Sequence, residues 1–173
     1  MSLKKNIIAF FIIGILGTLS HFIYEWTGEN NFIGYIFPVN ESTWEHLKLL
    51  FFPTVIYSVF EYILTKKRPE NYIPAVVISV ICGMTAIVTL FYTISGIIGR
   101  NVDFINISIY YIGVIVMLIK KNKIIKENKF SINIAYWFFL GLGLIIAILF
   151  ITWSYNPPSL GIFMPPSMSR ISV

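Results

Sequence analysis

The chain has 173 residues, of which 57% are hydrophobic and only 12% are charged, and its mean hydropathy is +0.78. A soluble domain carries roughly a quarter charged residues, so this composition excludes an ordinary soluble protein and predicts one compact domain in a bilayer. The net charge of +5 does not indicate nucleic-acid binding, because the basic residues gather at the ends of apolar segments rather than along one face.

In chain order, the sequence contains five apolar segments, each long enough to cross the hydrocarbon layer as a helix. We expect membrane-spanning helices at residues 6–25, 43–65, 72–97, 102–119 and 132–153. Strands are excluded because the segments lack strict alternation and an open sheet cannot lie in lipid. The fold class is therefore predicted to be an all-α integral membrane bundle of five transmembrane helices, in a single domain over residues 1–155.

The distribution of lysine and arginine predicts the orientation of this bundle. With the N-terminus inside, the cytoplasmic side carries ten basic residues: Lys4, Lys5, Lys66, Lys67, Arg68, Lys120, Lys121, Lys123, Lys126 and Lys129. Only Lys48, Arg100 and Arg170 then lie outside, so we expect the N-terminus inside and the C-terminus outside. The lysine-rich loop 120–131 is expected to contact anionic lipid. The prolines of residues 156–173 exclude a sixth helix and predict an extracytoplasmic tail.

The only two histidines of the chain lie with acidic residues around the first outer connection. His21 and Glu25 end the first apolar segment, whereas Glu41, Glu45 and His46 begin the second. Ionisable groups at membrane depth are costly and mark functional sites. His21 and Glu25 are four residues apart, so they share a helix face and can form a hydrogen bond or supply two metal ligands. We expect the imidazoles and carboxylates to converge in one pocket about one turn beneath the outer surface.

Part of this polar segment also has a structural explanation. Ser42 and Glu45 match a capping box, in which the Glu45 carboxylate reaches back to the amide of the cap residue. Lys48 lies three residues beyond Glu45 and can neutralise it, whereas His46 has no such explanation. The pocket is therefore a structural hydrogen-bond network, a metal site, or a proton or substrate relay.

Each functional alternative assigns different roles to these residues. In a metal site, His21, Glu25 and His46 would hold the ion, and zinc, iron or manganese would suit such nitrogen and oxygen ligands. Glu45 or Glu41 would then be the catalytic general base. The relay alternative uses a larger group: His21, Glu25, Glu41, Glu45, His46 and Lys48.

Two motifs carry a resemblance to a known family. The segments Ser20-His21-Phe22-Ile23-Tyr24-Glu25-Trp26 and Asn40-Glu41-Ser42-Thr43-Trp44-Glu45-His46-Leu47-Lys48 have the patterns S-H-x-x-Y-E-W and N-E-S-x-W-E-H-L-K. With these motifs the chain resembles a family of small uncharacterised multipass membrane proteins of Gram-positive bacteria. The resemblance covers chiefly the first 60 or so residues. It implies a location in the bacterial cytoplasmic (inner) membrane and implies nothing about chemistry.

The leading functional hypothesis is that the protein moves or senses a small solute, a proton or a cation through the His/Glu site. One alternative is a membrane-embedded, metal-dependent hydrolase or lipid-modifying enzyme. Another is a non-catalytic partner or immunity protein whose polar network only fixes the helices. The sequence does not decide whether the chain is an enzyme, and a homodimer is compatible with the small interior that five helices enclose.

Overall fold

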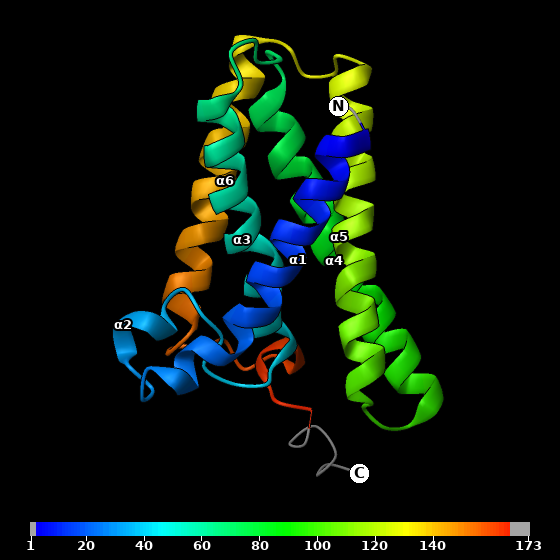
Figure 1. The fold of residues 1–173 in the computed structure, drawn as a ribbon. Helices are drawn as coiled ribbons and strands as arrows, with labels where there is room; N and C mark the ends of the chain where they lie inside the picture. Colours follow the sequence, from blue (N-terminus) through cyan, green and yellow to red (C-terminus); the bar gives the residue numbers. More distant parts are fainter. Residues whose placement is uncertain (1–2, 167–173) are drawn as a thin grey trace.

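The computed structural model describes residues 3–166, and the regular structure of this part of the chain is helical (Figure 1). The five long helices are α1 (Leu3–Trp26), α3 (Thr43–Leu64), α4 (Tyr72–Ile98), α5 (Asp103–Lys126) and α6 (Asn133–Trp153). Two short helical segments lie between and after them: α2 (Asn31–Gly34) and η1 (Gly161–Phe163). All five long helices are long and apolar enough to cross a membrane, which confirms the predicted bundle.

The largest difference from the predicted boundaries is at α5. This helix begins at Asp103, close to the expected start, but it continues to Lys126 instead of ending at 119. Lysine is a good helix former, and its long stem can cover apolar surface while the ammonium reaches water. The helix therefore extends past the point at which the apolar segment ends in the sequence.

Successive long helices run in opposite directions, so their connections gather at two ends of the bundle (Figure 1). The basic end comprises the start of α1 and the connections 65–71 and 127–132. The histidine end comprises the end of α1, α2, the start of α3 and η1. The last residues of the predicted tail, 167–173, which include Arg170, lie outside the described part of the chain.

Helix α3 lies in the middle of the bundle, where it packs against α1, α4 and α5 and also contacts η1. Helices α4 and α5 form an extensive antiparallel pair, and α6 packs mainly on α4. The centre of the core is apolar and contains the fully buried side chains of Leu50, Val80, Val114 and Met117. The middle of α3 is thereby held inside the bundle, and this placement positions the polar residues toward its two ends that are described below.

A glycine allows α1 to approach the rest of the bundle closely. The Tyr110 hydroxyl of α5 donates a hydrogen bond to the backbone oxygen of Ile13 at 2.9 Å and lies 3.4 Å from that of Leu49. A Cβ atom on Gly17 would overlap both the Tyr110 hydroxyl and the Leu49 carbonyl oxygen. The absence of a side chain at Gly17 is therefore required for the contact between α1, α3 and α5.

We expect Gly17→Ala to lower the free energy of unfolding by about 1–3 kcal/mol, because an added methyl group overpacks this contact. Thermal unfolding of the purified protein in detergent micelles, followed by circular dichroism, measures the effect. Gly141→Ala is the matched control, since a Cβ atom there meets nothing within 4 Å. An equal melting temperature for the two variants would contradict the packing argument.

Candidate functional site

Three side chains from separate elements converge at the histidine end. His21 lies near the end of α1, His46 in the first turn of α3, and Glu41 in the connection before α3. Glu41 Oε2 lies 3.4 Å from His46 Nε2 and 3.9 Å from His21 Nε2. The two imidazole rings meet edge to face with their centroids 5.1 Å apart. The predicted convergence of the two histidines is confirmed, and we call these three residues the His–Glu cluster.

The turn before α3 places Glu41 above the start of that helix. The Asn40 side-chain oxygen accepts the Ser42 N–H at 2.8 Å, which fixes a tight turn around Glu41. Ser42 in turn caps α3, because its Oγ accepts the Glu45 N–H at 3.3 Å. His46 follows Ser42 by one helical turn, so its ring projects back toward the same connection.

The backbone fixes the protonation pattern of His46. Its Nδ1 lies 2.9 Å from the backbone oxygen of Ser42. A carbonyl oxygen can only accept, so Nδ1 carries the proton, and in the neutral ring the lone pair is on Nε2. This lone pair faces the Glu41 carboxylate at 3.4 Å. Two electron-rich atoms at that distance repel each other unless a proton or a cation lies between them.

The electrostatics of Glu41 are consistent with this arrangement. When Nε2 also carries a proton, the hydrogen bond from His46 lowers the pKa of the Glu41 carboxyl, and the positive charge that His46 and His21 can carry adds to this effect, against an opposing contribution from partial burial. The side chains of His21, His46 and Glu41 are 35%, 31% and 66% exposed. An ion can therefore reach the His–Glu cluster without opening the bundle, and it meets an ionised carboxylate there.

The geometry of the His–Glu cluster suits a divalent transition metal. One ligand atom from each residue lies within 4.8 Å of the other two. Bonds from zinc to nitrogen and oxygen are about 2.0–2.2 Å, so tetrahedral ligand atoms lie about 3.3–3.6 Å apart. The distance between His46 and Glu41 already has this value, and small side-chain rotations would bring in His21. Two imidazoles and one carboxylate leave coordination positions open, as in catalytic zinc and iron sites.

Comparison with known proteins places the chain in a family. A family model with the description "Family of unknown function (DUF6512)" matches residues 1–171. The chain belongs to the DUF6512 family. No curated protein and no solved structure matches it. Membership confirms that the chain resembles an uncharacterised family, and it extends the likeness from the first part of the chain to nearly all of it.

A recess adjoins the His–Glu cluster of this DUF6512 protein. It has a volume of about 290 Å³ and lies between α3, α4 and α5. Its polar lining includes Glu41, His46, Asp103, Asn106 and Tyr110. A molecule in this recess would contact two of the three residues of the His–Glu cluster directly.

Glu25 lies apart from the His–Glu cluster. The helical spacing pairs it with His21, but the structure leaves Glu25 exposed and brings Glu41 to His21 instead. The difference arises because the connection before α3 folds back over the end of α1, which helix periodicity cannot indicate. The ligand set favoured by the geometry therefore contains Glu41 in place of Glu25.

Glu45 and Lys48 form a buried ion pair beneath the surface. Glu45 Oε2 accepts from Lys48 Nζ at 2.7 Å and from the Val39 N–H at 3.0 Å. The side chains of Lys48 and Glu45 are 0% and 2% exposed. The capping-box prediction is therefore half right: Ser42 caps the helix, but the Ser42 N–H is bound by Asn40 and not by Glu45.

Lys48 also binds the connection 27–42 and the residue that follows α6. Its ammonium donates to the Gly34 carbonyl oxygen at 3.0 Å and to Ser154 Oγ at 2.5 Å, and Phe37 O lies 3.4 Å away. Ser154 donates its own proton to the Phe150 carbonyl at 2.7 Å and is thus free to accept. The predicted neutralisation of Glu45 by Lys48 is confirmed. Through the same contacts both residues hold the connection that carries Glu41 in place. The catalytic role predicted for Glu45 is not favoured, because its carboxylate is already paired with Lys48 and buried.

A second buried ion pair at the basic end is absent from the sequence prediction. Lys121 Nζ lies 2.5 Å from Glu61 Oε2, which also accepts from the Tyr72 hydroxyl at 2.7 Å. Lys121 is only 3% exposed, so it is not one of the surface charges that orient the bundle. The signal for this contact is Glu61 itself, because an acidic residue within an apolar span requires a partner.

We expect Lys48→Met to lower the free energy of unfolding by about 3–5 kcal/mol, because it leaves the Glu45 carboxylate buried without its cation. The melting temperature in detergent measures this loss. The double change Lys48→Met with Glu45→Gln should recover part of the stability, since the unpaired charge is removed.

Lys129→Met is the matched control for this prediction. Lys129 pairs with Glu127 at 2.7 Å, but both side chains are exposed, so the melting temperature should not change. A double variant less stable than Lys48→Met alone would show that the buried charge is not the cause.

Proposed function

We propose that this DUF6512 protein binds a divalent transition-metal cation, of which zinc is the best example, at His21, Glu41 and His46, and that it senses this cation at the membrane surface. The observation that carries the proposal is the placement of His46. Its tautomer is fixed by the Ser42 carbonyl, so Nε2 presents a lone pair to the Glu41 carboxylate at 3.4 Å. A cation between Nε2 and the carboxylate would remove the repulsion between these two groups.

A metal ion explains the arrangement more fully than a single proton does. A proton shared between His46 and Glu41 would need only these two groups, whereas His21 also directs a nitrogen to the same carboxylate oxygen, at 3.9 Å. A hydrogen bond from the ring nitrogen that does not bind the metal, here Nδ1, to a backbone carbonyl is typical of metal-binding histidines. The three ligands come from α1, α3 and the connection between them, so a bound cation would tie these elements together. Binding of the cation would therefore change how firmly α1 and α3 are held together, and sensing requires such a difference between the bound and free states.

The interior of the bundle supports sensing over movement through a single copy. The core between the helices is filled with apolar side chains, among them Leu50, Val80 and Met117. An ion crossing such a region would lose its hydration without replacement ligands. The basic residues gathered at the opposite end favour placing the histidine end outside the cytoplasm, in a bacterial inner membrane.

We expect zinc to raise the melting temperature of the tag-free protein in detergent, because a ligand that binds only the folded state stabilises it. The gain is about 2.7 kcal/mol when the free zinc concentration is a hundred times the dissociation constant. Isothermal titration calorimetry should give one site per chain. Binding should weaken as the pH falls, because protons compete with the cation for the imidazole nitrogens.

Three variants test the assignment of ligands. His46→Ala and His21→Ala should each weaken zinc binding by more than tenfold, whereas Glu25→Gln should bind as the wild type does. Glu25 is a suitable control because it carries the same charge as Glu41 near His21 but is exposed outside the His–Glu cluster. Wild-type protein that binds no zinc, or an equal loss in Glu25→Gln, would reject the site.

A metal-dependent hydrolase is the second candidate, and the recess beside the cluster is the observation that favours it. A metal with open coordination positions activates water and polarises a carbonyl or phosphoryl oxygen. Glu41 and His46 line the recess, so a substrate there would lie next to the ion. Turnover of ester or phosphoester amphiphiles by zinc-loaded protein, lost in His46→Ala, would distinguish an enzyme from a sensor.

A further inference from the structure

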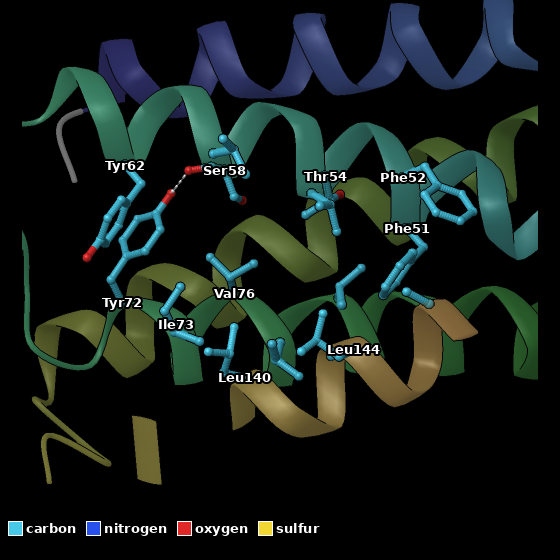
Figure 2. Close-up of a pocket in the computed structure, with 16 residues that line it drawn as sticks. Phe51, Phe52, Thr54, Ser58, Tyr62, Tyr72, Ile73, Val76, Leu140 and Leu144 are labelled. Carbon is cyan, nitrogen blue, oxygen red and sulfur yellow. Dashed lines mark hydrogen bonds between the residues drawn. The ribbon is translucent and has the colours of Figure 1, made fainter. Parts of the chain in front are cut away.

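A groove in the membrane-facing surface lies between α3, α4 and α6 (Figure 2). Its volume is about 270 Å³, and its lining is almost entirely apolar. In Figure 2, Phe51 and Phe52 lie at one end of the groove, whereas Tyr62 and Tyr72 lie at the other. The groove is elongated along α3, and its apolar lining suits a hydrocarbon chain.

The groove is accessible from the side of the bundle. Val55 and Val59 of α3 and Leu144 of α6 line it, and they are 38%, 51% and 58% exposed at the surface. These positions lie within helices that are long and apolar enough to span a membrane. A lipid chain can therefore enter the groove from the bilayer without any rearrangement of the helices.

One polar group in the groove has no partner. Ser58 lines the groove and is only 6% exposed, yet its hydroxyl forms no hydrogen bond with any of the described residues. A buried polar group usually has a partner, and each exception needs an explanation. The hydroxyl is covered in this structure, and a rotation about the Cα–Cβ bond of Ser58 would turn it toward an acceptor oxygen of a ligand in the groove.

A basic recess adjoins the groove at the basic end of the bundle. It has a volume of about 170 Å³ and is lined by Lys5, Lys67 and Arg68, among others. Tyr62 and Tyr72 line both the recess and the groove, so the two spaces meet at this tyrosine pair. Glu61 also lines the recess, but its charge is balanced by Lys121. The recess is therefore net positive.

We propose that the groove and the basic recess together bind one anionic glycerophospholipid of the bilayer. An acyl chain lies in the groove, an ester oxygen accepts from Ser58, and the phosphate lies at Arg68 and Lys67. The Arg68 guanidinium lies 4.1 Å from the centre of the Tyr62 ring. Tyr62 follows Ser58 by one helical turn, about 5.4 Å, which the glycerol segment of a phospholipid bridges. Basic pockets between membrane helices are established sites for anionic headgroups.

This site differs from the lipid contact predicted for the lysine-rich segment 120–131, which begins within α5. That contact would be a diffuse attraction between exposed lysines and the membrane surface, without selectivity for one bound molecule. The proposed site combines a chain groove, a buried donor and a cationic recess, so it should retain a single lipid after extraction.

Native mass spectrometry of the detergent-solubilised protein tests the proposal with phosphatidylglycerol and phosphatidylcholine of identical acyl chains. We expect one phosphatidylglycerol to be retained per chain, and the double variant Lys67→Gln/Arg68→Gln to lower its affinity by about ten- to thirtyfold. The control is Lys123→Gln/Lys126→Gln, which removes the same charge from exposed positions outside the recess. Equal retention of phosphatidylcholine, or an equal loss in the control, would overturn the proposal.

A second pair of variants tests the groove without changing charge. Leu144→Trp should fill the groove and lower phosphatidylglycerol retention, whereas Ile148→Trp should not, because Ile148 is similarly exposed, at 56% against 58%, but does not line the groove. Ser58→Ala should weaken retention by a smaller factor. A dimer that dissociates in Leu144→Trp would assign the groove to a second copy of the chain and overturn the lipid proposal, as would unchanged retention in that variant.

Discussion

The buried ammonium of Lys48 is the interaction on which the histidine end depends. It joins the Glu45 carboxylate to backbone oxygens of the connection 27–42 and to Ser154 at the end of α6. A charge with no exposure is tolerated only where oxygen atoms replace its hydration shell. The connection must therefore fold back over α3, and that path delivers Glu41 to the two imidazoles. The buried contacts of Lys48 therefore hold in place the connection that carries the exposed Glu41.

Helix α3 carries a buried ion pair near each of its ends, with an apolar core between them. At the histidine end the pair lies within one helix and supports a connection, whereas at the basic end Glu61 reaches Lys121 of α5. Both pairs are costly to desolvate, so we infer that they contribute to the fold mainly by specifying which elements pack together. The two proposed ligand sites adjoin them: the cation site lies above the first pair, and the lipid groove ends beside the second.

Much of this architecture could be predicted from local patterns. The five spans follow from apolar length, and the Ser42 cap and the neutralisation of Glu45 by Lys48 follow from spacing along one helix. The predictions that were wrong have two causes. The end of α5 was placed too early because the helix propensity of lysine continues the helix beyond the apolar segment. The pairing of His21 with Glu41 depends on the folded path of the connection before α3, which a periodic pattern does not describe. The partner of Glu61 lies on another helix, so no spacing rule could select Lys121.

The sequence by itself determined that this is a helical membrane protein and that its two histidines lie near Glu41 and Glu45 at one end, because apolar length and the rarity of charge in lipid leave few other solutions. Only the tertiary structure decided that Glu41 is the carboxylate that meets the imidazoles and that the predicted pair of Glu45 and Lys48 is fully buried. Glu41 and Glu45 are four residues apart in the sequence and chemically alike, so their separate roles come from the folded path of the connection, which places one at the surface and the other beneath it.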